Sequence, residues 1–362
     1  MTREEPLDLA RLAESSTGAE EKPQPEIRDS RFVQARRSTT FWIGLAIIAI
    51  AVVFGFITPF HSFVKPENLF AIGLNASVIM LLGVGMTFLI GAGHLDLSVG
   101  YSLILASVIG AKTMVALGGT ALEVQSGAYP NLGLAISAGV IAAIGSGIAI
   151  GLLNGLLVTR LRLSSFIVTL ATSGVAYGLA LILTSAANVA YIPNELQDNF
   201  GGAKFERLIP YPLLLALAIG GVFWAVLRKT RFGMRTLAIG SSRDAATRAG
   251  VDVNRHTLKL FVMMGVLVGI AAIVDISRNA NTNVSGHQTD NLQAIAAVVI
   301  GGTSLFGGIA SIGGTLLGTL IPVMLANGLV QMAVPPFYQY MLVGVILILA
   351  VYFDQRRRER SS

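Results

Sequence analysis

Long apolar segments recur along almost the whole chain, and this pattern most limits what it can fold into. A helix needs about 20 mostly apolar residues to cross a bilayer. Segments of this kind lie near 41–59, 69–91, 97–117, 132–158, 165–186, 211–227, 257–277, 291–305, 308–333 and 337–353. Hydrophobic residues make up 53% of the chain and charged residues 13%, which argues against a soluble domain. The sequence therefore predicts an all-α polytopic membrane protein with about ten transmembrane helices.

Lysine and arginine concentrate in connections that share one side of the membrane if the N-terminus is inside. These are the region before residue 41, the turn at Arg160 and Arg162, the polar stretch 228–259, and the residues after 353. Such a basic excess marks the cytoplasmic side, so the net charge of +6 does not indicate nucleic-acid binding. We predict a disordered cytoplasmic tail at 1–40, a transmembrane domain at 41–353 and a basic cytoplasmic tail at 354–362.

Two short motifs occur twice along the chain. Gly-His at 93–94 is repeated at 286–287, and Asn-Gly-Leu at 154–156 is repeated at 327–329. Five predicted spans separate the copies of the first motif, so corresponding segments must run in opposite directions. This arrangement predicts two inverted five-helix halves, about 41–186 and 211–353, with broken helices at the Gly-His motifs and an extra loop in the first half. Chance is the alternative, because the motifs are short and glycine is abundant.

Polar residues follow both predicted helix breaks. After Gly91 and Gly93 break the second span, Asp96 can cap the helix that follows. A carboxylate at bilayer depth normally faces a cavity or serves function, so solute contact is the second interpretation. The same alternatives hold for His287 and Asp290. Asp275 and Arg278, three residues apart near the end of the seventh span, are predicted to form a structural ion pair.

Glycine recurs every four residues on two of the apolar segments. The positions are Gly147, Gly151 and Gly155 on the fourth, and Gly314 and Gly318 on the ninth. This spacing makes one face of a helix smooth, so that another backbone can approach closely. We expect helix packing at these glycines, with Asn154 and Asn327 as hydrogen-bonding residues between helices.

The polar stretch 228–259 contains the sequence Ser-Ser-Arg-Asp-Ala-Ala-Thr-Arg-Ala-Gly-Val at 241–251. Ser241 stands where an N-cap would, Asp244 falls in the first turn, and Gly250 can end the helix. These residues predict a two-turn helix in the cytoplasm. A helix this short needs a partner surface, and an ordinary solvated loop is the alternative.

The chain resembles the membrane permeases of ribose-type ABC importers, which take up monosaccharides and related small polar molecules in bacteria. The resemblance rests on residues 93–100, 154–170, 240–253 and 294–314. It implies a multi-pass subunit of the bacterial inner membrane that works as a homodimer or heterodimer. It also implies separate ABC ATPase subunits, which bind ATP and Mg, and a periplasmic solute-binding protein. This chain would be a transport subunit, not an enzyme, and would bind no cofactor or metal.

The resemblance also assigns residues to two roles. Contact with the ATPase falls on the predicted cytoplasmic helix, at Ser241, Asp244, Ala245, Ala246, Arg248 and Gly250. The substrate path falls near the breaks and on the fifth and tenth spans, with the candidates His94, Asp96, Ser165, Phe166, Thr169, Asn291, Gln293 and Tyr338. His94 replaces a glycine of the family pattern, and Asn291 and Gln293 stand near positions that are commonly acidic. These differences leave a polyol or modified sugar open as the solute.

The energy source is not carried by this chain. No Gly-Lys dipeptide occurs, so there is no phosphate-binding loop, and energy must come from a separate ATPase or from an ion gradient. An ion-coupled secondary transporter is therefore the alternative function, with Asp96 and Asp275 as candidate ion carriers. An intramembrane enzyme is disfavoured, because the four histidines are far apart in sequence and there is no cysteine.

Overall fold

The computed structural model describes residues 39–206, 208–335 and 337–359. The elements are α3 (Thr39–Ile57), η2 (Pro59–Val64), α4 (Pro66–Gly91), α5 (Val99–Gly118), α6 (Ala121–Gln125), α7 (Leu132–Arg160), α8 (Ser165–Thr184), α9 (Asn194–Leu196), η3 (Gln197–Gly201), β1 (Lys204–Phe205), β2 (Ile209–Pro210), α10 (Tyr211–Lys229), α11 (Arg231–Ser241), α12 (Arg243–Arg248), α13 (Val253–Asn279), α14 (Asp290–Ile300), α15 (Ile312–Gly318), α16 (Leu320–Gln331) and α17 (Phe337–Glu359).

Across these described residues, nine helical segments are long and apolar enough to cross a membrane, with α15 and α16 together forming one of them. The all-α polytopic fold class is thereby confirmed. The eighth predicted span, 291–305, is wrong. The 11-residue helix α14 replaces it, and at 1.5 Å per residue it reaches only about 16 Å. The chain turns at Gly302, Gly307 and Gly308, whose φ angles of +90°, +83° and +81° suit glycine.

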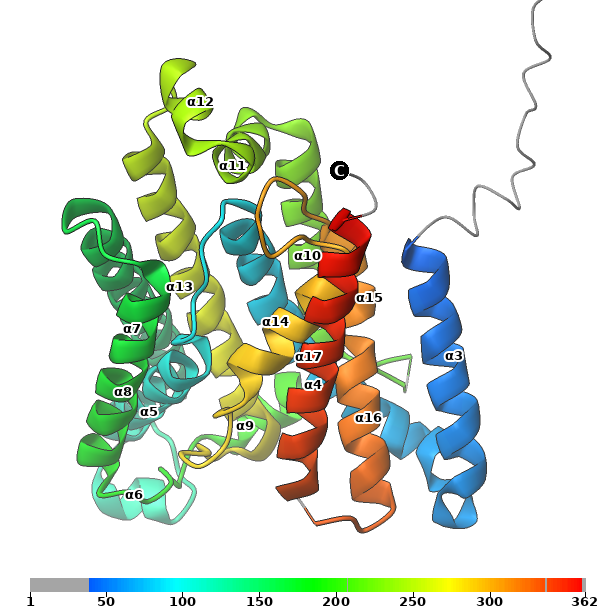
Figure 1. Cartoon of the computed structure of the whole chain (residues 1–362). Helices are drawn as coiled ribbons and strands as arrows, with labels where there is room; N and C mark the ends of the chain where they lie inside the picture. Colours follow the sequence, from blue (N-terminus) through cyan, green and yellow to red (C-terminus); the bar gives the residue numbers. More distant parts are fainter. Residues whose placement is uncertain (1–38, 207, 336, 360–362) are drawn as a thin grey trace, which may run out of the picture. The chain divides into compact units, whose positions relative to one another are not determined.

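Helices α4 and α13 form the centre of the bundle (Figure 1). Their membrane-spanning windows are 72% and 78% buried, whereas those of α3 and α17 are only 11% and 12% buried. Helix α4 packs against α10, α13 and α14, and α13 also packs against α5 and α7. The apolar core therefore lies between the two central helices and their neighbours, and the outer helices present apolar faces.

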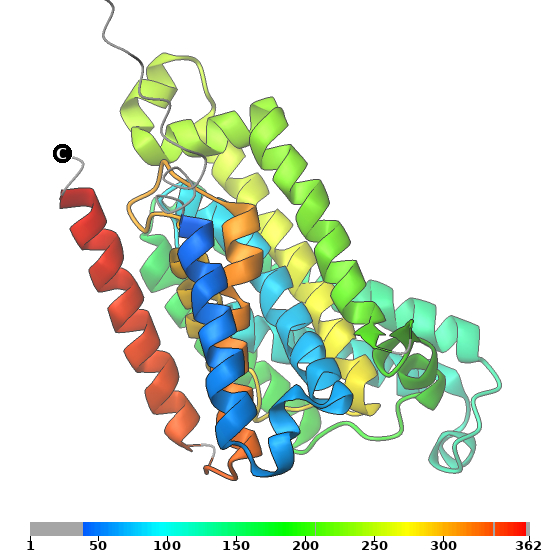
Figure 2. The ribbon, with the colours of Figure 1, turned by 90° about the vertical axis from the view of Figure 1, so that its right-hand side faces the viewer.

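The two central helices run in opposite directions. Helix α4 ends beside α11, since the Gly91 carbonyl accepts from the Gly308 N–H (3.0 Å) and faces Gly240. Helix α13 begins just after α12 and ends where Ser277 contacts Gly201 in η3. We call these two ends of the bundle the α12 end and the α6 end; Figure 2 shows them from the side.

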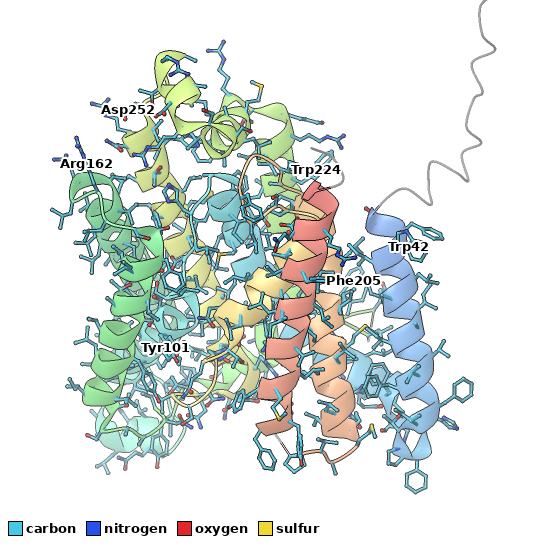
Figure 3. All side chains as sticks on the ribbon, viewed as in Figure 1. Trp42, Tyr101, Arg162, Phe205, Trp224 and Asp252 are labelled. Carbon is cyan, nitrogen blue, oxygen red and sulfur yellow. The ribbon has the colours of Figure 1, made fainter. Side chains whose placement is uncertain are left out.

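The contacts of the two central helices are related in the way that inverted halves require. Helix α13 packs on α5 and α7 of the first half, and α4 packs on α14, α15 and α16 of the second half. Arg162, after α7, and Asp252, after α12, lie at the same end of the bundle (Figure 3). The basic connections at 160–162 and 228–259 therefore share one side, as the charge pattern requires.

The structure describes only part of each predicted tail. Nearly all of the predicted N-terminal tail lies outside the described residues. Residues 354–359 were predicted as tail but continue α17, because no proline or glycine interrupts the helix there. Residues 360–362 lie outside the described residues.

The connections at the α6 end contain short elements. Helix α6 begins with a capping box, in which Thr120 Oγ1 accepts from Glu123 N–H and the Glu123 carboxylate accepts from Thr120 N–H. Strands β1 and β2 pair antiparallel, with Lys204 opposite Pro210 and Phe205 opposite Ile209. These short elements give the connections between the long helices a regular structure at this end of the bundle.

Candidate functional site

The first helix break is held by the Asp96 carboxylate. Asp96 is buried, and its Oδ1 accepts from the N–H (2.9 Å) and the hydroxyl (2.6 Å) of Ser98. Asn154 on α7 donates its amide to the Ser98 hydroxyl (3.0 Å). The two hydrogen bonds of Asp96 Oδ1 therefore fix the turn at which α5 begins.

Two hydroxyls of α8 hold the backbone of the same break. Leu95 N–H donates to Ser165 Oγ (3.3 Å), and Leu97 N–H donates to Thr169 Oγ1 (3.0 Å). Ser165 and Thr169 were predicted as path residues, but the structure turns both hydroxyls toward this loop and buries Thr169 completely. Here they position the break, and they do not line the polar cavity described below.

His94 lies against α13. Its Nε2 is 3.4 Å from the Thr257 hydroxyl, and its ring packs on Phe261 with centroids 6.0 Å apart. The side chain therefore joins the break to the central helix of the other half.

The second break holds a buried cluster of two carboxylates around one imidazole. His287 Nδ1 lies 2.7 Å from Asp290 Oδ2, and His287 Nε2 lies 2.9 Å from Asp275 Oδ1. The predicted Asp275–Arg278 pair is therefore wrong: loop 280–289 returns His287 to the depth of Asp275, and Arg278 turns to a cavity. The cluster fastens the start of α14 to α13.

The two breaks touch each other inside the bundle. Asn291 Nδ2 donates to the Leu97 carbonyl (3.1 Å). On the next turn, a Cβ added to Gly100 would overlap the His287 carbonyl oxygen, so these two backbones are in direct contact. The repeated Gly-His motifs thus lie in two loops that enter the bundle from opposite ends. The helices that follow these loops, α5 and α14, begin next to each other inside the bundle. Asn291, predicted as a path residue, joins them.

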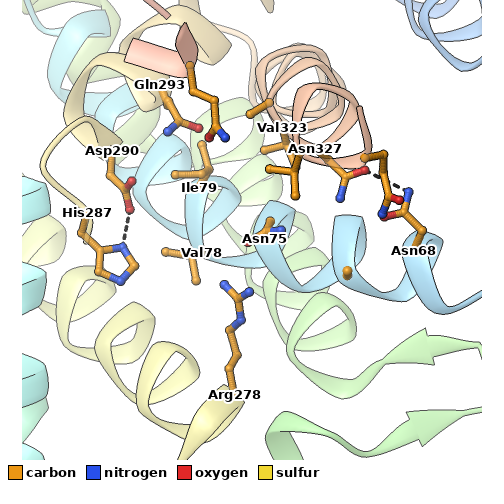
Figure 4. A pocket seen from close by; sticks show the side chains of 15 residues that line it. Asn68, Asn75, Val78, Ile79, Arg278, His287, Asp290, Gln293, Val323 and Asn327 are labelled. Carbon is orange, nitrogen blue, oxygen red and sulfur yellow. Dashed lines mark hydrogen bonds and ion pairs between the residues drawn. The ribbon is translucent and has the colours of Figure 1, made fainter. Parts of the chain in front are cut away.

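A polar cavity of about 430 Å³ opens between α4, α14, α16, α17 and the end of α13 (Figure 4). Amide side chains provide most of its polar lining: Asn68, Asn75, Gln293, Asn327, Gln331 and Gln339. Arg278, His287 and Asp290 line it too, so the cavity reaches the carboxylate–imidazole cluster. Of the predicted path residues only Gln293 lines it, and the volume lies within the range of small-molecule sites.

Three of the amides are bonded to one another on one side of the cavity. Asn68 Nδ2 donates to Asn327 Oδ1 (2.9 Å), and Gln331 Nε2 donates to Asn68 Oδ1 (2.5 Å). Asn327 therefore joins α16 to α4. The sequence analysis missed Asn68 and Asn75, although their spacing of seven residues places both on one face of an otherwise apolar helix.

Phe166 and Tyr338, the aromatic path candidates, lie elsewhere. Each is 49% exposed, on α8 and α17 respectively, and neither lines the cavity. Gln339, the neighbour of Tyr338, points to the cavity instead. The two aromatic rings belong to faces of the bundle that this single chain leaves open.

The predicted cytoplasmic helix is present as α12. Its N-cap is Ser242, whose Oγ accepts from Ala245 N–H (3.3 Å), so the prediction of Ser241 as the cap is wrong. Helix α11 extends through Ser241, and the chain becomes extended only at Ser242. Gly250 has a φ of +81° just after the helix.

The faces of α12 differ sharply. Ala246 is 5% exposed and belongs to the apolar core, whereas Asp244, Ala245 and Arg248 are exposed. The helix is thus fixed to the bundle on one side and free on the other at the α12 end.

The glycine stripes lie at close helix crossings. Gly147 and Gly151 face the carbonyls of Gly265 and Phe261 on α13, and Gly155 faces Leu258. Added Cβ atoms at Gly314 and Gly318 would overlap the carbonyls of Gly301 and Ala297, at and near the end of α14. Among the described residues, no group of three or more histidine, aspartate or glutamate side chains could hold a metal ion.

Comparison with known proteins gives one family and several close relatives. The sequence profile of the family described as "Branched-chain amino acid transport system / permease component" matches residues 68–351. The chain is 37% identical to the L-arabinose ABC transporter permease protein of Azospirillum brasilense, over 82% of this chain and 83% of that one. It is 34% identical to the ribose import permease protein of Bacillus subtilis, over 87% and 92% of the two chains.

A third relative is the fructose import permease protein of Rhizobium meliloti, with 30% identity over 88% of this chain and 84% of that protein. The family description refers to amino acids, whereas these three proteins are named for sugars. The resemblance inferred from the motifs at 93–100 and 294–314 is confirmed. Because the matches cover most of both chains, this chain belongs to the permease family of the branched-chain amino acid transport type.

Proposed function

We propose that this chain is the membrane permease subunit of an ATP-driven ABC importer for a monosaccharide or related small polar solute. Helix α12 is the observation that carries the proposal, because a capped helix that is anchored by the buried Ala246 and otherwise exposed at the basic end is suited to receive another protein. The names of the relatives, which are permeases for arabinose, ribose and fructose, supply the solute class. Transport, and not catalysis, is the role of such subunits.

The partners follow from the same reasoning. An ABC ATPase, with its own ATP and Mg, would contact Asp244, Ala245 and Arg248 at the cytoplasmic side. A periplasmic solute-binding protein would deliver solute at the α6 end. A second permease subunit, identical or related, would cover the apolar faces of α8 and α17. From the positive-inside charge pattern we infer that the α12 end faces the cytoplasm, and a bacterial inner membrane with cytoplasmic termini is part of the same proposal.

Alternating access is the mechanism that this arrangement supports. Closure of the ATPases would move α12 and the adjoining α11, and α11 contacts the last residue of α4 and the loop at 301–311. Helix α4 lines the polar cavity at its other end, so its displacement changes the cavity directly. The solute would enter that cavity and pass the point where the two breaks meet.

The ion-coupled alternative is not favoured by the geometry. Asp96 Oδ1 accepts two hydrogen bonds from Ser98, and Asp275 lies against His287. Both carboxylates thus hold parts of the protein in place. The names of the relatives also support the ABC function and not the ion-coupled one.

The test uses the absence of cysteine from the chain. A single Ala245→Cys substitution is cross-linked in native membranes, and the captured ATPase is co-reconstituted with the permease and its binding protein in proteoliposomes. Accumulation of labelled L-arabinose, D-ribose or D-fructose should require ATP. Accumulation driven by a proton or sodium gradient without ATP would contradict the proposal.

A further inference from the structure

The polar cavity has hydrogen-bonding groups that the protein itself does not use. Within the described part of the chain, the Asn75 amide and the Arg278 guanidinium have no bonded partner. Figure 4 shows the guanidinium pointing into the cavity toward α4. Polar groups in the membrane interior are costly unless they face water or a ligand, so these two side chains indicate that the cavity is filled by a polar molecule.

Apart from Gln339, the remaining polar side chains of the cavity are already committed. Asn68, Asn327 and Gln331 bond one another on one side, and His287 and Asp290 are joined on the opposite side. These two sides are thereby rigid, and Asn75 and Arg278 lie between them. Rigid walls with a few free donors and acceptors are the usual design of a small-molecule site.

The chemistry of the lining favours a neutral ligand with several hydroxyl groups. An amide both donates and accepts, and a guanidinium donates in a fixed planar fork that can bind two adjacent oxygens. Val78, Ile79 and Val323 supply apolar surface for the C–H face of a ring. The carboxylates of Asp275 and Asp290 at the imidazole offset the positive charge of Arg278, which disfavours an anionic solute.

We propose that this cavity is the site at which the permease itself holds the solute, a neutral monosaccharide or polyol, with Arg278 and Asn75 as its specificity-determining residues. The inference rests on the proposed function for the solute class. It assigns recognition to the permease as well as to the binding protein.

Single-cysteine labelling tests the site without requiring transport. Ala326 lines the cavity and carries no polar group, so Ala326→Cys is the reporter. It is treated with a charged, membrane-impermeant methanethiosulfonate reagent with and without D-ribose, L-arabinose, D-fructose or xylitol. Gln125→Cys, exposed on α6 at the same end of the bundle, is the control.

A neutral sugar or polyol is expected to slow labelling of Ala326→Cys about twofold when its concentration equals the dissociation constant. It should leave Gln125→Cys unaffected. D-gluconate, which is anionic, should protect much less. Failure of every neutral compound to protect, or equal protection by gluconate, would overturn the inference.

Two further variants assign the residues. In the Ala326→Cys background, Arg278→Gln should raise the protecting sugar concentration about tenfold or more, since a hydrogen bond to a charged group is lost. Lys65→Gln removes an exposed charge at the same end and should change nothing. Unchanged protection in both Arg278→Gln and Asn75→Leu would refute the assignment.

The labelling test of the cavity and the uptake test of the proposed function can fail independently of each other. If the cysteine-free parent shows no ATP-dependent uptake with its partners, the proposed function fails whatever the labelling shows. If the parent transports but no transported sugar protects Ala326→Cys, the cavity is not the solute site and the function stands.

Discussion

The crossing of α7 and α13 depends on Gly151, and the structure gives the cost of filling it. A Cβ at Gly151 would overlap the Phe261 carbonyl oxygen and lie 3.1 Å from the Phe261 carbonyl carbon and 3.2 Å from Gly265 Cα. All of these are backbone atoms, so no side chain can rotate away. The two helices must separate, and overpacking of this kind costs about 1–3 kcal/mol.

Gly145 on the same helix is the matched control. It is exposed, and a Cβ there would meet nothing within 4 Å. Alanine at this position should stabilise the helix by about 0.5–1 kcal/mol relative to glycine. That gain applies at both positions, so the free energies of unfolding of Gly151→Ala and Gly145→Ala should differ by about 1–3 kcal/mol, which corresponds to roughly 1–4 °C in Tm for a chain of this size.

The assay is thermal unfolding of the purified variants in one detergent. The fraction of protein that stays monodisperse after heating is measured by size-exclusion chromatography. Both variants should insert in the membrane, because alanine in place of glycine makes the span slightly more apolar. Equal midpoints for Gly151→Ala and Gly145→Ala would refute the reasoning that this crossing is fixed by backbone contact.

Three further results are expected. Ala245→Cys should cross-link to the ATPase readily and Ala246→Cys poorly, because only the first side chain is exposed; equal yields in native membranes would contradict this orientation of α12. Ser242→Ala should remove the N-cap, at about 1 kcal/mol, and lower uptake relative to ATP hydrolysis, whereas Ser241→Ala should not. Asn291→Leu should lower the free energy of unfolding by about 1–3 kcal/mol, measured as above, since a carbonyl of the first break loses its donor.

Sequence patterns predicted the parts of this fold that depend on local chemistry. Runs of apolar residues locate nine spans, since burial of the backbone in lipid requires helices of a fixed length. The alanines at 245–246 and Gly250 locate α12. The short helix α14 could not be found this way, because the apolar run continues past Ile300 and the chain turns only at Gly302, Gly307 and Gly308.

The candidate site depends on tertiary pairings that spacing alone does not give. Asp275 and Arg278 are correctly spaced for an i,i+3 pair, yet His287 takes Asp275 because loop 280–289 folds back into the bundle. Ser165 and Thr169 have the polarity of path residues, but their partners lie 70 and 72 residues away. Asn68 and Asn75 give a local signal, two amides on one face of a largely apolar helix, which identifies the cavity once the helix is known to be central.

Helix α4 connects the α12 end, where we propose that the ATPase binds, to the polar cavity, where we propose that the solute binds. Its last residue, Gly91, is bonded to Gly308 and lies against Gly240 of α11 with no room for a side chain at Gly240. Asn75, near its other end, faces the cavity. A helix with its backbone hydrogen bonds satisfied internally moves as a stiff rod over this length, so a displacement of α11 at Gly240 must shift one wall of the cavity. The opposite wall is tied to α13 through His287 and Asp275. Because α4 and α13 run in opposite directions, movement of one against the other can open one end of the path while it closes the other.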